Sequence, residues 1–78
     1  MKIRRAHLPN TDKVFIYENK KEEFSLIAIP EKYWSIIVKY EEAFQEVDEK
    51  LLKSLIKVTD EEEAKLLAGK IRHWITEM

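Results

Sequence analysis

Residues 14–29 read VFIYENKKEEFSLIAI, and this stretch decides the fold. Two runs rich in β-branched and aromatic residues, 14–17 and 24–29, enclose a polar turn over residues 19–22. That arrangement predicts an antiparallel β-hairpin. A weaker strand pattern over residues 2–8, followed by turn residues, extends the hairpin to a meander of two or three strands.

In both hairpin strands the apolar residues fall on both faces. Val14 and Ile16 alternate with Phe15 and Tyr17, and the second strand repeats this two-sided pattern. A small sheet with one face in water would alternate apolar and polar residues instead. The pattern predicts that both faces are covered, by helices, by another subunit, or by one of each.

The remainder of the chain is expected to be helical. Pro30 suits the first position of a helix, and after it apolar residues recur at steps of three and four as far as Val47. A second helix is predicted over residues 49–58, with Asp48 as its N-cap. Residues 54–59 also fit a short strand, but Leu51, Leu52, Leu55 and Ile56 make a helical face and favour the helix.

The sharpest boundary signal is Thr59-Asp60-Glu61-Glu62, which has the pattern of a capping box. In such a box the Thr59 hydroxyl accepts a hydrogen bond from the Glu62 N–H, and the Glu62 side chain reaches back. The acidic residues that follow also suit the positive end of the helix dipole. A third helix is therefore expected to begin at this point.

The predicted fold class is α+β: a small antiparallel β-meander of two or three strands, followed by two or three helices packed on the sheet. Seventy-eight residues are expected to form a single domain, residues 1–78. The predicted core consists of the apolar positions of the helices: Tyr33, Ile37, Tyr40, Phe44, Leu55, Leu67, Ile71 and Ile75.

Composition narrows the possible functions. The chain has no cysteine, one glycine and two histidines, so we expect no metal site, no cofactor and no thiol chemistry. Paired carboxylates are frequent, but they are predicted in turns and on polar helix faces, where acid–base catalysis has no pocket. No apolar run approaches the length of a membrane span, and the N-terminus lacks the apolar segment of a signal peptide. We therefore expect a non-enzymatic, cytoplasmic protein that has no membrane partner.

Two groups of residues lie off the predicted core faces. On a helix, Trp34 and Val38 would be displaced from the apolar stripe, and an exposed tryptophan is typical of an interface. The alternative is that a flanking segment covers Trp34. In the last helix Leu66, Gly69 and His73 share the outer side, where a mid-helix glycine has no evident use unless another backbone approaches. These five residues are the predicted partner-binding site. The alternative for Gly69 is that it arose by neutral drift, is tolerated by the helix and has no function.

Charge is distributed unevenly along the chain. Residues 1–21 carry six Lys or Arg against two Asp or Glu, a net charge of +4. Residues 41–63 carry three basic against nine acidic residues, a net charge of −6. Either these segments face water or each other, or one end binds an anion and the other a cationic partner. The candidate nucleic-acid-binding residues are Lys2, Arg4, Arg5, Lys20 and Lys21.

The sequence therefore predicts a non-enzymatic protein-interaction module, a homodimeric small accessory, regulatory or inhibitory protein. Its expected partner is itself or another protein. Nucleic-acid binding through the basic N-terminal strands is the alternative. The sequence pI of about 6.1 counts against that alternative, because nucleic-acid-binding modules are usually basic.

Overall fold

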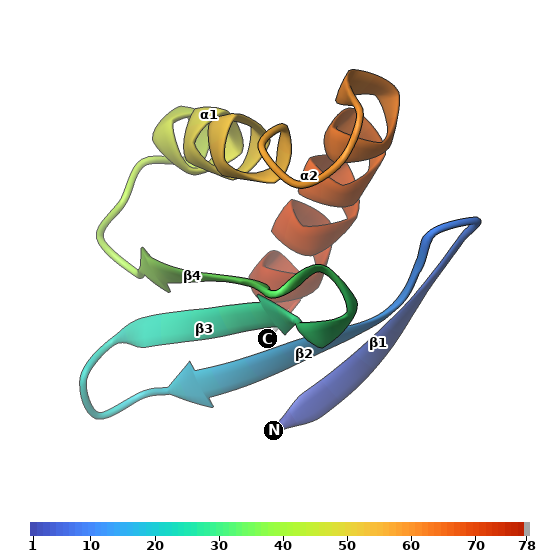
Figure 1. Ribbon diagram of the computed structural model, residues 1–78. Coiled ribbons are helices and arrows are strands. Elements are labelled where there is room, and N and C mark those ends of the chain that lie inside the picture. Colours follow the sequence, from blue (N-terminus) through green and yellow to red (C-terminus); the bar gives the residue numbers. More distant parts are fainter. Residues whose placement is uncertain (78) are drawn as a thin grey trace. The chain divides into compact units, whose positions relative to one another are not determined.

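The computed structural model describes residues 1–77 and confirms the α+β class (Figure 1). It has a four-stranded antiparallel sheet, not the two or three strands expected, and two α-helices. By its internal contacts the chain forms two compact units, residues 1–42 and 43–78, which we describe separately. The elements are β1 (Lys2–Leu8), β2 (Thr11–Asn19), β3 (Phe24–Ile29), the 3₁₀ turn η1 (Pro30–Lys32), β4 (Trp34–Lys39), α1 (Phe44–Leu55) and α2 (Glu61–Glu77).

The first unit is a simple meander in which the strands lie in the order β1-β2-β3-β4 (Figure 1). The predicted hairpin of residues 14–29 forms its centre, with Ile16 opposite Ile27 and Tyr17 opposite Leu26. At the turn, the Asn19 side-chain oxygen accepts a hydrogen bond from the Glu22 N–H at 3.0 Å. Such side-chain bonds to nearby backbone are the reason that asparagine favours turns.

A β-bulge distorts the pairing of β1 with β2. Arg5 pairs with Lys13 and Leu8 with Thr11, so two residues of β1 oppose one residue of β2. His7, one of the two, has the left-handed φ of 57°. A bulge of this kind bends an edge strand and increases its twist, which hinders pairing with other chains.

The predicted helix over residues 30–47 is wrong. Pro30 does begin a helical turn, but η1 ends after three residues because Tyr33 adopts a left-handed conformation with φ of 50°. The chain then reverses into β4, which pairs with β3 along its whole length, from Ile29 opposite Trp34 to Phe24 opposite Lys39. Trp34-Ser-Ile-Ile-Val-Lys39 is rich in β-branched residues, and this strand preference outweighs a helical stripe that fits the same residues.

The second unit is a pair of helices. Val47, Leu51 and Leu55 recur at four-residue steps on α1 and are buried, and α1 contacts α2. Asp48 is not an N-cap as predicted, because α1 begins four residues earlier, after Ala43. Within this unit Asp48 pairs with Arg72 of α2 at 3.5 Å. Residues 54–59 form neither the strand nor a complete helix: α1 ends at Leu55 and a turn follows.

The start of α2 lies one residue later than a cap at Thr59 would place it. The Asp60 carboxylate accepts a hydrogen bond from the Glu63 N–H at 2.7 Å and therefore caps the helix. The Thr59 hydroxyl instead donates to the Glu63 carboxylate at 2.5 Å. The predicted boundary is confirmed, but Asp60 takes the capping role expected of Thr59.

The core predictions divide between the two units. Leu55, Leu67 and Ile71 are fully buried as predicted, and Ile75 is half-buried. The four predictions that rested on a continuous helix over residues 30–47 are wrong, since Tyr33, Ile37, Tyr40 and Phe44 are all exposed. In place of these four, the buried apolar residues of the first unit are Ala6, Val14, Ile16, Ile27, Ile29, Trp34 and Val38.

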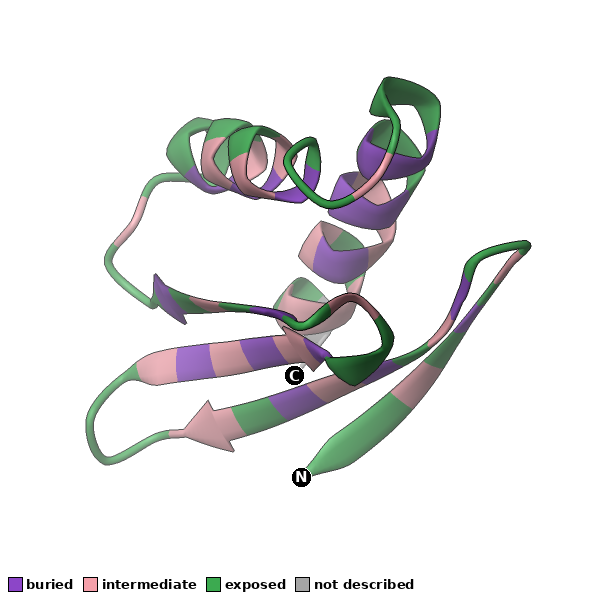
Figure 2. Cartoon of the chain, in the orientation of Figure 1, coloured by how far each residue is buried: buried purple, intermediate pink, exposed green. Residues whose placement is uncertain are grey.

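The two faces of the sheet differ in burial, visible as alternating bands along β2 and β3 in Figure 2. Val14 and Ile16 are fully buried, as are Ile27 and Ile29 on the next strand. The residues between them, such as Phe15 and Leu26, are only half-buried. Within the chain only one face of the sheet is well buried, and cover of the other face by another subunit stays a prediction.

Candidate functional site

The less buried face of the sheet is the candidate site, which we call the open face. Strand register places its apolar side chains in two adjacent rows. One row runs across all four strands and the other across β2, β3 and β4. The rows are Ile3–Phe15–Ala28–Ser35 and Tyr17–Leu26–Ile37, and Phe24 follows at the next position along β3.

Large apolar side chains of the open face are accessible. Ile3 is 55% exposed, Tyr17 39% and Ile37 47%. The rings of Tyr17 and Phe24 form an edge-to-face pair with centroids 6.4 Å apart. Neighbouring positions on one face of a sheet lie close enough for such pairs. The open face thus presents an aromatic and aliphatic surface at the centre of the sheet.

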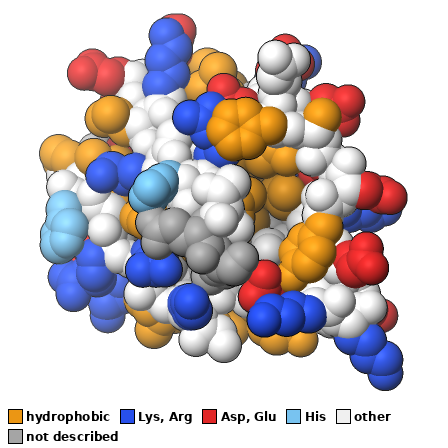
Figure 3. Space-filling model, turned by 180° about the vertical axis from the view of Figure 1, so that it is seen from behind, with side chains coloured by type: hydrophobic (Ala, Val, Ile, Leu, Met, Phe, Trp, Pro, Cys, Tyr) orange, Lys and Arg blue, Asp and Glu red, His pale blue; other side chains and the backbone are white. Residues whose placement is uncertain are grey.

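The charged positions of the open face are all basic. Arg5 and Lys13 pair across β1 and β2 at one end, and Lys39 lies beside Phe24 at the other. By strand alternation the remaining polar positions are Thr11, Asn19 and Ser35, and the carboxylate nearest to this face in the sheet is that of Asp12, which is bonded to Arg5. Figure 3 shows one side of the molecule, on which acidic and basic side chains are interspersed between hydrophobic ones.

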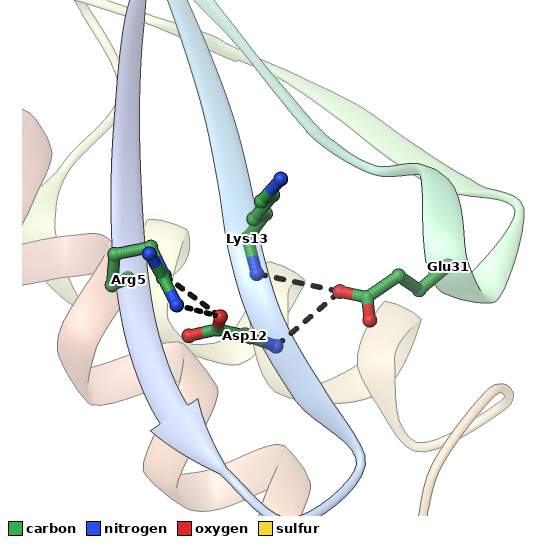
Figure 4. A network of polar contacts seen from close by, with 4 residues as sticks. All are labelled: Arg5, Asp12, Lys13 and Glu31. Carbon is green, nitrogen blue, oxygen red and sulfur yellow. Dashed lines mark hydrogen bonds and ion pairs between the residues drawn. The ribbon is translucent and has the colours of Figure 1, made fainter.

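Carboxylates near the Arg5 corner are engaged in local contacts (Figure 4). The Arg5 Nε donates to Asp12 Oδ2 at 2.7 Å, and this hydrogen bond lowers the pKa of Asp12 and raises that of Arg5. A Glu31 carboxylate oxygen lies 3.3 Å from the backbone N–H groups of both Asp12 and Lys13 and accepts from them. Glu31 thereby provides a hydrogen-bond acceptor for backbone N–H groups of β2 beyond the point at which β3 ends.

The predicted nucleic-acid-binding residues do not form one surface. Lys2 and Arg4 lie opposite the buried residues Ile16 and Val14, on the other face from Arg5. Strand alternation separates them, because successive side chains point to opposite faces. Lys20 and Lys21 are exposed in the loop between β2 and β3. Only Arg5 of the five contributes to the open face.

The predicted partner-binding residues are distributed over both units. Trp34 and Val38 lie on β4, not on a helix, and both are buried. Leu66, Gly69 and His73 are all on α2, where Leu66 and His73 are exposed. A Cβ added at Gly69 would meet no atom within 4 Å, so nothing in the chain requires a glycine there.

Residues 1–77 contain no group of three or more His, Asp or Glu side chains that could hold a metal ion. Neither helix in the same part of the chain is long and apolar enough to cross a membrane.

Sequence reasoning missed Lys39 and Ile37 as residues of the site because it placed both on a helix, with Ile37 in the core. The available signal was the two-sided apolar pattern of Phe15 and Tyr17 against Val14 and Ile16. That pattern indicates two apolar faces, whereas the chain buries only one of them well.

Comparisons with known proteins extend over both units. A family model described as "YueH-like protein" matches residues 2–77. The chain is 45% identical, over 83 aligned positions, to "Uncharacterized protein YueH" of Bacillus subtilis (strain 168), with the whole of both chains covered. No solved structure matches the chain. These names state no activity, so a function has to be argued from the open face.

Proposed function

We propose that this chain, which belongs to the YueH-like family, is a non-enzymatic interaction module whose docking surface is the open face of the sheet. The observation that carries this proposal is the exposure of Ile3, Tyr17 and Ile37 on one continuous face. Contiguous exposed apolar surface on a small protein is typical of a binding site. The non-enzymatic part rests on the sequence, whose carboxylates and serines form no catalytic pattern.

A second copy of the chain is the protein partner that the sequence predicts. In that form of the function, two open faces would meet as an isologous homodimer. Burial of Tyr17, Ile37 and their neighbours would supply apolar area that a chain of 78 residues otherwise lacks. The accessory or regulatory role expected from the sequence would follow from such an interface.

The test compares two exposed aliphatic residues of similar accessibility. Ile37 on the open face is 47% exposed, and Leu66 on α2 is 49% exposed. We expect Ile37→Ser to weaken any association, with itself or with a ligand, by about tenfold, and Leu66→Ser to leave it unchanged. Sedimentation over a concentration series, with and without mixed oligonucleotides, measures both.

The reverse result would contradict the proposal. If Leu66→Ser and Gly69→Leu abolish association while Ile37→Ser has no effect, the binding surface is the outer side of α2. That outcome would support the helix residues Leu66, Gly69 and His73 as the partner site in place of the open face.

Nucleic-acid binding is the second candidate, and one observation favours it. The open face combines aromatic rings with basic residues and has no acidic strand position. A protein that binds single strands needs this combination of rings for bases and cations for phosphates.

A further inference from the structure

The charge of the open face limits the partners that it suits. Arg5, Lys13 and Lys39 are its charged strand positions, and Asp12 compensates Arg5 in part. If two open faces met, Lys13 and Lys39 of both copies would enter one interface, and the Asp12 carboxylate beside it is already bonded to Arg5. Like charges brought together in this way oppose association. Charge complementarity therefore favours an anionic partner over a second copy.

The aromatic residues of the face narrow the choice of anion. Phe15 and Tyr17 are two residues apart on β2 and so point to the same side, and Phe24 contacts Tyr17 from β3. Base stacking on such rings requires unpaired bases, because the faces of paired bases are occupied by their neighbours in the duplex. An acidic protein could also use the lysines, but only unpaired bases offer flat aromatic faces on which these rings can stack.

The two lysines lie at opposite ends of the open face, with Phe15 and Tyr17 between them along the strands. Lys13 precedes Phe15 on β2, whereas Lys39 lies opposite Phe24 and beyond Ile37 on β4. Asn19, which is in register with Phe24 and Lys39, is six positions after Lys13 on β2, or roughly 20 Å along the sheet. A strand of a few nucleotides laid across the face would contact the rings centrally and a lysine at each end.

We propose that the open face binds single-stranded nucleic acid, with Tyr17, Phe15 and Phe24 stacking on bases while Lys13 and Lys39 contact phosphates. This inference rests on the proposed function, because it names the partner of the same docking surface. It requires no residue of the second unit. The predicted basic residues Lys2 and Arg4 have no part in it, because they lie on the opposite face.

The experiment titrates the full chain into labelled single strands of about 12 nucleotides, oligo(dT) and oligo(U), with a duplex as comparison. Tyr17→Leu retains apolar area but removes the ring, and we expect it to weaken binding about 5- to 100-fold. Tyr17→Phe retains the ring and should bind like the natural chain. Because Tyr17 is 39% exposed, neither change should prevent folding, which circular dichroism checks.

Salt dependence tests the lysines separately. Lys13→Gln and Lys39→Gln should each lower the slope of log affinity against log salt by about 0.7, since each removes one phosphate contact. Lys53→Gln, an exposed change on α1, is the matched control and should leave the slope unchanged.

Three results would overturn the inference. These are no binding of either single strand at low salt, equal affinity for duplex and single strand, or equal binding by the Tyr17→Leu and Tyr17→Phe variants. A different result rejects the proposed function: it fails only if Ile37→Ser leaves every association unchanged. A homodimer that Ile37→Ser disrupts, without oligonucleotide binding, would retain the function and reject nucleic acid as its partner.

Discussion

Gly69 occupies an interior position of α2 where a side chain would meet open space within the chain. A glycine at such a position costs the helix about 1 kcal/mol relative to alanine, because it gives the unfolded chain more freedom. Tyr33 shows a related strain, since it is 99% exposed and holds a left-handed conformation that costs most residues about 1–2 kcal/mol. Neither residue is explained by packing inside the chain.

We expect Gly69→Ala to raise the free energy of unfolding by about 1 kcal/mol, because the added methyl group meets no neighbour. Urea denaturation measures the change, and Lys70→Ala on the same helix provides a control with no gain expected. A loss of stability together with a loss of self-association would instead mean that another chain approaches this glycine.

At the scale of elements, local signals identify where a helix begins more reliably than which residue caps it. Thr59 and Asp60 are both good N-cap residues, and the two are adjacent. The structure selects Asp60, whose carboxylate accepts from Glu63, while Thr59 bonds the Glu63 side chain. Glu62, the acidic partner in the predicted capping box, is exposed.

Two substitutions distinguish these arrangements. Asp60→Ala should lower the free energy of unfolding by about 1 kcal/mol, because it removes the acceptor for the Glu63 N–H. Glu62→Ala should change it by less than about 0.5 kcal/mol, as is usual for an exposed surface position. Thermal unfolding of both variants measures the difference. An equal loss of stability in Glu62→Ala would support the predicted capping box that begins at Thr59.

At the scale of the whole molecule, the chain folds as two compact units of contrasting type, a sheet over residues 1–42 and a helix pair over residues 43–78. The single domain expected from the length stays a prediction. Tyr40 lies where the sheet ends, and its backbone N–H donates to the Glu23 carbonyl at 3.0 Å. Ionisation of its phenol also makes the stability of the chain depend on pH in the alkaline range.

Desolvation, with a hydrogen bond to the Glu18 carboxylate, raises the pKa of Tyr40 from 10.0 to about 12. The folded chain thus holds this proton more tightly than the unfolded chain. The resulting stabilisation is complete below pH 10 and is lost as pH rises through about 12. Because Tyr40 is 45% exposed, we expect the effect to be small.

Alkaline titration followed by tyrosinate absorbance tests this linkage. Glu18→Gln removes the carboxylate charge and should lower the pKa of Tyr40. Tyr40→Phe is the control that identifies the signal. The same midpoint in the natural chain and in Glu18→Gln would show that Glu18 has no influence on this phenol.

By itself the sequence determined what depends on near neighbours: the hairpin of residues 14–29, the turn at Asn19, and the helix boundary around Asp60. Only the tertiary structure decided between strand and helix for residues 34–39, because β4 gains its hydrogen bonds from β3 and no local period reports that pairing. The same pairing exposes Ile37, buries Trp34, and places Lys39 beside Phe24. The open face is therefore a product of strand register, which brings together residues that lie far apart in the chain.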